Sequence, residues 1–190
     1  MTARVVGVCV SKSKGERKTP VGSAQLRVNH GIEGDAHAGE WHRQISLLAM
    51  ESIRKMQEMG LKVSSGDFAE NLTTEGIELF TLPIGTLLTI GDALLEVTQI
   101  GKECHTRCAI FYQAGDCVMP KEGIFARVLR GGDVADGAII CLEPEQVQAG
   151  RKGGPTGLDV RWGISLHLLA LDTRGAGIAA ASHLLSPRFG

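Results

Sequence analysis

Side chains that could do chemistry crowd into one stretch, residues 101–123. It contains three of the chain's five cysteines, a histidine and an arginine: Cys104, His105, Arg107, Cys108 and Cys117. Cationic neighbours lower the pKa of a thiol and favour the thiolate, the form that attacks, carries sulfur or binds metal. Arg107 directly precedes Cys108 and Lys102 lies six residues earlier. From spacing alone, Cys108 fits a reactive thiol and a buried cysteine packed beside Ile110 equally well.

The same stretch could instead bind zinc through Cys104, His105, Cys108 and Cys117. Zinc sites usually pair two cysteines at a short spacing and add a second close pair farther along the chain. Here one C-x3-C pair is followed by a single cysteine, so the pattern is incomplete. A zinc-stabilised, non-catalytic module therefore stays an alternative. Cys9 and Cys141 lie in strand-like runs, and we expect both in the core.

A second polar cluster lies in a glycine-rich loop, residues 34–43, which contains His37, His42 and Arg43. A guanidinium presents paired donors to phosphate and other oxyanions. The alternative is that these side chains make only local hydrogen bonds. We expect the loop to form one wall of the pocket around Cys108, with His37 and Arg43 within about 15 Å of it, the scale of a small-molecule pocket.

The elements that must position these residues are mostly strands. Runs rich in β-branched residues predict strands, and apolar residues at helical spacing predict a helix over residues 50–59 that ends at Gly60. Gly91–Asp92 has the composition of a two-residue hairpin turn. A short helix is expected after Cys104. The predicted strands are residues 3–11, 24–29, 44–49, 71–74, 86–90, 93–100, 124–129 and 138–142.

Strands and helices do not alternate regularly, so the pattern predicts a mostly β fold, a closed or nearly closed mixed β-barrel with a few short helices. The charged run of residues 12–18 reads as a solvated loop, although such a loop can also guard an anion site. Arg127 alternates with apolar residues in a predicted strand. It is expected on a solvated face unless it reaches the cysteine pocket.

Composition and the N-terminal sequence argue against a nucleic-acid-binding, a membrane or a secreted protein. The chain has 190 residues, 43% of them hydrophobic, and a net charge of −1. That charge gives no reason to expect nucleic acid or a membrane as a partner. The N-terminus lacks the apolar core of a secretory signal, and five cysteines without such a signal favour reduced thiols in the cytoplasm.

Three separated motifs give the chain a family resemblance. They are residues 34–39 (GDAHAG) with residues 42–48 (HRQISLL), residues 66–76 (GDFAENLTTEG), and residues 101–108 (GKECHTRC) with residues 115–120 (GDCVMP). From about residue 3 to residue 143 the chain resembles the MOSC domains, named for the C-terminus of eukaryotic molybdenum cofactor sulfurases, and most of all the small stand-alone bacterial members. The resemblance implies a β-barrel-like fold of the pyruvate-kinase-barrel type and a link to molybdenum cofactor (molybdopterin) or to sulfur delivery for metal–sulfur centres.

The resemblance also implies roles for single residues. The Arg-Cys-x-Ile setting makes Cys108 the molybdenum ligand or the carrier of a persulfide, with Cys104 as a second catalytic thiol. Family members are further associated with pyridoxal phosphate. The implied partners are a sulfur donor of the cysteine desulfurase type, a molybdoenzyme or cofactor-synthesis protein, and a second copy of the chain. The cofactor-binding residues that we expect are His37, His42, Arg43, Asn71, Lys102, Arg107 and Arg127.

Two readings compete with a sulfur carrier or cofactor-binding protein: a molybdenum-dependent reductase of N-hydroxylated compounds, as some larger relatives are, and the zinc module. The expected domain is residues 1–145. Residues 146–190 begin with a glycine-rich linker and continue as a tail of unknown role. We expect the hydrophobic core to be complete before the linker.

Overall fold

The computed structural model describes residues 2–102, 104 and 109–143. Some of the predictions fall outside the described residues. These concern the thiol Cys108, its neighbour Arg107, and the linker and tail of residues 146–190. All described residues belong to one compact unit, Met1–Gln148.

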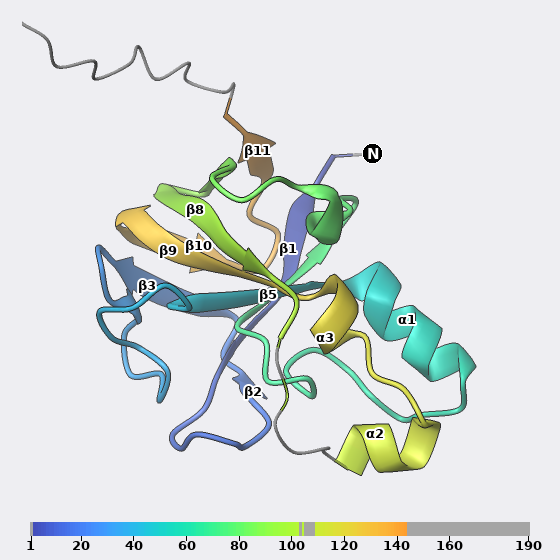
Figure 1. Cartoon of the computed structure of the whole chain (residues 1–190). Coiled ribbons are helices and arrows are strands. Elements are labelled where there is room, and N and C mark those ends of the chain that lie inside the picture. The colour runs from blue at the N-terminus through green and yellow to red at the C-terminus, as the bar shows by residue number, and fades with distance from the viewer. Residues whose placement is uncertain (1, 103, 105–108, 144–190) are drawn as a thin grey trace, which may run out of the picture. The chain divides into compact units, whose positions relative to one another are not determined.

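Eight of the strands form one large mixed sheet (Figure 1). All neighbouring strands in it are antiparallel except β5 and β6, which run parallel. In spatial order the strands are β11 (Ile140–Leu142), β7 (Leu87–Ile90), β8 (Ala93–Ile100), β9 (Ile124–Arg130), β5 (Ile45–Ala49), β6 (Leu72–Glu75), β1 (Arg4–Val10) and β2 (Thr19–Pro20).

A smaller sheet and the helices complete the described part. The second sheet has the order β10 (Gly132–Ala135), β3 (Ser23–Arg27) and β4 (Gly31–Ile32). The helices α1, α2 and α3 lie on the same side of the strands in Figure 1, and a 3-10 turn, η1, precedes β7. Their bounds are α1 Met50–Glu58, η1 Leu79–Thr81, α2 Ala109–Ala114 and α3 Met119–Glu122.

The large sheet comes close to closing on itself. Its strand ladders leave it open between β11 and β1, but a single bridge joins Arg4 to Ile139 just before β11. The backbone N–H of Val5 also donates to the carbonyl oxygen of Ala138 at 2.8 Å. The predicted mostly β, mixed fold is confirmed, whereas a fully closed barrel is not formed.

Two buried clusters stabilise these elements. The larger fills the space enclosed by the strands, with fully buried side chains such as Leu47, Leu72 and Leu95. The smaller lies under the helices and includes Ile110 of α2 and Phe125 of β9. Because β5 and β9 contribute alternate residues to the two clusters, they form the wall between them.

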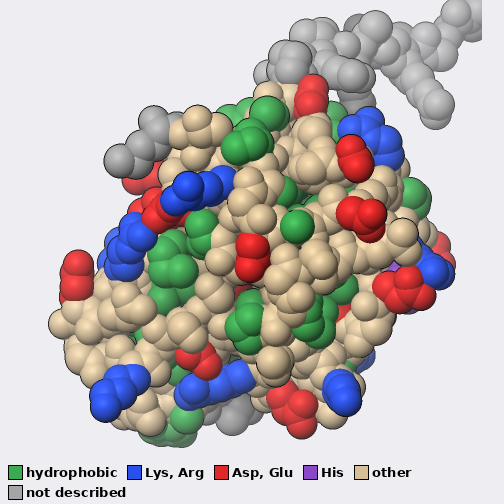
Figure 2. Space-filling model, turned by 180° about the vertical axis from the view of Figure 1, so that it is seen from behind, with side chains coloured by type: hydrophobic (Ala, Val, Ile, Leu, Met, Phe, Trp, Pro, Cys, Tyr) green, Lys and Arg blue, Asp and Glu red, His purple; other side chains and the backbone are tan. Residues whose placement is uncertain are grey.

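The described helices are all short, and none of them is long and apolar enough to cross a membrane. On the face drawn in Figure 2, acidic and basic side chains are interspersed with apolar ones. That face therefore lacks the broad basic patch expected of a nucleic-acid-binding surface.

Candidate functional site

A buried ion pair organises the glycine-rich loop. The ammonium of Lys18 contacts Oδ1 of Asp35, and both side chains are 1% exposed. Lys18 was expected in a solvated loop. That prediction is correct for residues 12–17, which are exposed, and wrong for Lys18. An opposite charge that lies 17 residues along the chain compensates the burial of Lys18, and composition alone does not reveal such a partner.

The pKa values of both partners in this pair are lowered, for different reasons. Burial lowers the pKa of Lys18, even though the hydrogen bond and charge of Asp35 act in the opposite direction. Burial would raise the pKa of Asp35, but the hydrogen bonds that its carboxylate accepts hold that pKa well below its usual range. Asp35 is therefore an anion in the folded chain at neutral pH.

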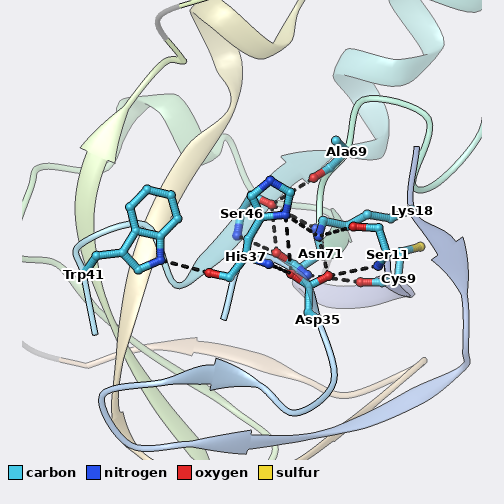
Figure 3. Close-up of polar contacts among 9 residues, drawn as sticks. All are labelled: Cys9, Ser11, Lys18, Asp35, His37, Trp41, Ser46, Ala69 and Asn71. Carbon is cyan, nitrogen blue, oxygen red and sulfur yellow. Dashed lines mark hydrogen bonds and ion pairs between the residues drawn. The ribbon is translucent and has the colours of Figure 1, made fainter. Parts of the chain in front are cut away.

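Asp35 also ties the loop to the end of β1. Its Oδ1 accepts a hydrogen bond from the backbone N–H of Ser11 at 3.0 Å, and its Oδ2 accepts one from the backbone N–H of His37 at 2.9 Å. The indole of Trp41 donates to the carbonyl oxygen of His37 at 2.9 Å, as Figure 3 shows. The backbone of His37 is thus held from both sides, and its side chain remains 25% exposed.

Beside this pair, Ser46 and Asn71 join three strands. Oδ1 of Asn71 accepts hydrogen bonds from the backbone N–H and the hydroxyl of Ser46, at 3.2 and 2.9 Å. Its amide nitrogen donates to the carbonyl oxygen of Cys9 at 3.2 Å. Asn71, an expected cofactor-binding residue, is 1% exposed. The structure places it in an internal polar network rather than at a surface.

Glu70 is a further buried carboxylate in this region, and sequence reasoning did not single it out. It is fully buried and accepts hydrogen bonds from the backbone N–H groups of Gly66 and Phe68 and from the hydroxyl of Thr73. Burial raises its pKa, although these hydrogen bonds favour the ionised form. Since all its partners are local, Glu70 shapes the turn before β6.

The far end of the loop lies against the end of β8. Nε2 of His42 is 3.1 Å from Oε1 of Gln99, and the hydroxyl of Thr98 donates to the carbonyl oxygen of His42. The chain continues from Gln99 through Gly101 and Lys102 to Cys104. The structure therefore brings the glycine-rich loop to β8, the strand that leads into residues 104–108, which we call the cysteine segment.

The guanidinium of Arg43 lies over two aromatic rings. The central carbon of its guanidinium is 5.2 Å from the ring centroid of Trp41 and 5.5 Å from that of Phe125. Its Nε is buried and has no hydrogen-bond partner within the described structure. A buried donor without an acceptor is costly. The Nε–H donor of Arg43 is thus unused within the described residues.

The other expected cofactor-binding residues are placed differently. Lys102 is half-buried, directly after Gly101. Arg127 shares the outer face of β9 with Phe125, but it pairs with Glu96 of β8 at 2.6 Å and is half exposed. This agrees with the solvated strand face that was its default reading.

The cysteines differ in exposure. Cys9 is fully buried, as expected, and burial together with the charge of Glu70 raises the pKa of its thiol to about 12. Cys117 is also buried, and Cys104 is exposed. Cys141 was expected in the core but is exposed, because in the short strand β11 the residue before it points inward and Cys141 points outward.

The described residues show no side-chain cluster that marks a metal centre at this site. No group of three or more His, Cys, Asp or Glu side chains in the described part of the chain is arranged to hold a metal ion. The zinc alternative involves His105 and Cys108, which lie outside the described residues. A hollow of about 220 Å³ lies elsewhere, and none of its lining residues is an expected site residue: Ala49, Glu51, Ser52, Lys55, Gly76, Ile77, Glu78 and Phe80.

Comparisons with known proteins agree with this architecture. Among solved structures, YuaD from Bacillus subtilis is 20% identical, with a TM-score of 0.62 over 74% of this chain and 94% of that one. YiiM from Geobacillus stearothermophilus is 23% identical, with a TM-score of 0.58 over 77% and 78%. YiiM from Escherichia coli is 21% identical, with a TM-score of 0.54 over 76% and 71%. At these identities the likeness concerns the fold.

A search of curated proteins finds no match. The family model of the MOSC domain matches residues 34–150, more than half of the chain, and this range includes the glycine-rich loop and the cysteine segment. The chain therefore belongs to the MOSC domain family.

Proposed function

We propose that this chain is a sulfur-carrier or molybdenum-cofactor-binding protein that acts in the maturation of molybdenum cofactor or of metal–sulfur centres. Cys108 is the proposed thiol, and Cys104 is secondary. A single observation carries the proposal: the glycine-rich loop contacts β8, the strand that leads to the cysteine segment. In this contact Nε2 of His42 lies 3.1 Å from Oε1 of Gln99.

Both flanks of the cysteine segment support this proposal. On one side, Gln99 and Cys104 are five residues apart, so their Cα atoms are at most about 17 Å apart. On the other side, α2 begins at Ala109, and its Ile110 belongs to the same buried cluster as Phe125. Arg43 stacks on that phenylalanine. The flanks of the cysteine segment and the anion-binding side chains thus belong to one region of the fold.

The side chains present also fit a pterin cofactor with a phosphate group. Arg43 carries a guanidinium, whose several N–H donors suit a phosphate oxygen, and its Nε has no partner within the described structure. Trp41 is 38% exposed and offers an aromatic surface beside it. His37 and Lys102 are the other donors in the region. The chemistry that such a cofactor supplies when bound is that of a metal centre for which a soft thiolate is a suitable ligand.

Sulfur carriage needs only the thiolate and a protein donor that carries a persulfide. The thiolate of Cys108 attacks the outer sulfur of the donor persulfide, and the sulfur–sulfur bond of the donor breaks. The donor cysteine leaves as a thiolate, and the outer sulfur remains on Cys108 as a new persulfide. No net oxidation occurs, so a second co-reactant is not required.

The proposal is tested on the full chain in two measurements. The first determines the metal content and oxidisable pterin of freshly purified protein. The second follows sulfur transfer from a persulfide donor by mass spectrometry, in the wild type, in Cys108→Ser and in Cys141→Ser, the exposed-cysteine control. Bound molybdenum with pterin, or a gain of about 32 Da at Cys108, supports the proposal. Stoichiometric zinc without either result, or undiminished sulfur uptake by Cys108→Ser, contradicts it.

A further inference from the structure

Lys18 is buried too deeply to contact a ligand, but it contacts His37, whose side chain is partly exposed. An ammonium has three N–H donors and no acceptor. Lys18 has three partners for them: Oδ1 of Asp35, Oγ of Ser11 at 3.4 Å, and Nδ1 of His37 at 3.3 Å (Figure 3). Because an ammonium cannot accept, Lys18 is the donor in any hydrogen bond that these contacts form.

This requirement decides which nitrogen of His37 carries the proton. A neutral imidazole has one N–H and one bare nitrogen, and the neighbours of one nitrogen determine the state of the other. Nδ1 faces an ammonium and so must present its lone pair. Oδ2 of Asp35 also faces Nδ1 and its closeness to His37 contributes to the low pKa of Asp35, but at 3.6 Å it is farther from Nδ1 than Nζ of Lys18, at 3.3 Å, and beyond hydrogen-bond distance.

We infer that Lys18 is a positioning residue that holds neutral His37 as the Nε2–H tautomer, so that His37 offers a hydrogen-bond donor to the site. Nε2 lies on the side of the ring opposite Nδ1, and in Figure 3 it points away from both Lys18 and Asp35. Two backbone contacts fix the loop around it, Asp35 to the N–H of His37 and Trp41 to its carbonyl.

The tautomer limits what His37 can bind. With its proton on Nε2, the ring can donate to a phosphate oxygen or to a persulfide sulfur, but it has no outward lone pair for a metal ion or for proton abstraction. The ligand at His37 is therefore a hydrogen-bond acceptor, such as an anionic oxygen of a phosphate. This inference rests on the proposed function for the identity of that anion, but the inference about the tautomer does not.

The alternative is that Lys18 and Asp35 form a structural ion pair that has no influence on the imidazole ring of His37. In that case Nδ1 would donate to Asp35 after a small rotation, and Lys18 would be satisfied by Asp35 and Ser11. The two cases differ in the protonated nitrogen of His37 and can be separated by a spectrum.

The test is a long-range proton–nitrogen correlation spectrum of the ¹⁵N-labelled full chain at about pH 8, where histidine rings are ordinarily neutral. A His37→Gln variant identifies the signals of His37. We expect its Nε2 to be protonated and its Nδ1 bare. Protonation at Nδ1, or a mixture of both tautomers, overturns the inference.

Two lysine variants test whether Lys18 determines the tautomer of His37. Lys18→Met should move His37 toward a mixture of tautomers, while Lys14→Met, at an exposed position of the same loop, should leave it unchanged. An unchanged tautomer in Lys18→Met overturns the role of Lys18. If Lys18→Met does not fold because Asp35 loses its partner, the wild-type spectrum still decides the tautomer.

A titration with inorganic phosphate separates this inference from the proposed function. A shift of the Nε2–H signal of His37, saturating with phosphate and absent at His30, supports the anion site. The expected tautomer without any phosphate response leaves Lys18 in its role and refutes the ligand class. Sulfur uptake at Cys108 combined with the opposite tautomer refutes the inference alone.

Discussion

The guanidinium of Arg43 lies over the ring of Phe125, with its central carbon 5.5 Å from the ring centroid. This contact joins the end of the glycine-rich loop to the strand that follows the cysteine segment. It also explains how a buried, unpaired Nε is tolerated, because a cation over an aromatic face gains about 0.5–2 kcal/mol. A residue held this way is positioned for the anion binding that we propose for Arg43.

Replacing Arg43 should therefore weaken anion binding more than folding. We expect Arg43→Gln to reduce phosphate or pterin affinity about tenfold or more, since a charge-assisted hydrogen bond is lost, and to change the free energy of unfolding by about 1 kcal/mol or less. Isothermal titration and urea unfolding measure the two effects. Arg127→Gln is the matched control, because Arg127 pairs with Glu96 on the same face. Equal loss of affinity in both variants would argue against a specific role for Arg43.

The cysteines should differ sharply in reactivity. The pKa of Cys9 is raised to about 12, so at neutral pH it is a buried thiol and should not be alkylated in the folded chain. Cys104 and Cys141 are exposed and should be labelled, and Cys108 should be labelled fastest. Mild alkylation followed by peptide mass spectrometry gives the order. Labelling of Cys9 before Cys141 would contradict the burial described above.

Asn71 should be important for stability. Its amide makes three hydrogen bonds, two to Ser46 and one to Cys9, in a position that is 1% exposed. Asn71→Ala leaves buried partners unsatisfied, and we expect a loss of about 2–4 kcal/mol in the free energy of unfolding. Gln99→Ala, at a half-buried position, should cost less than about 1 kcal/mol. If urea unfolding gives comparable losses of unfolding free energy for the two variants, the hydrogen bonds of Asn71 are not especially important for stability.

The sequence predicted regular elements better than the polar site. The helix from Met50 to Glu58 and the Gly91–Asp92 turn follow from local patterns, and both are confirmed. Strand β10 was missed because its Gly132 indicates a turn; a Cβ there would lie 2.7 Å from the carbonyl carbon of Asp92, so close packing requires glycine. Lys18 was missed because its burial depends on Asp35, and charge pairing across 17 residues leaves no local signal.

The depressed pKa of Asp35 predicts a loss of stability in acid. The folded state keeps the carboxylate ionised to lower pH than the unfolded chain does, so below about pH 5 the unfolded state binds more protons. The stabilisation from Asp35 is therefore present above the ordinary carboxyl pKa and is lost as the pH falls. Urea unfolding between about pH 7 and pH 3 should show a flatter pH dependence for Asp35→Asn than for the wild type. Asp133→Asn, at an exposed strand position, should behave like the wild type.

Finally, a chain that ends at Glu145 should fold by itself. Every member of both buried clusters lies between Val5 and Ile140, so the described core needs nothing beyond β11. Removing residues 146–190 should therefore preserve a cooperative thermal transition, with a midpoint within a few degrees of the full chain. Because a loss of about 1 kcal/mol shifts the midpoint of a domain of this size by about 2–8 °C, calorimetry can detect a contribution of the tail. An insoluble or non-cooperative truncated chain would show that the apolar segment of residues 164–171 belongs to the core.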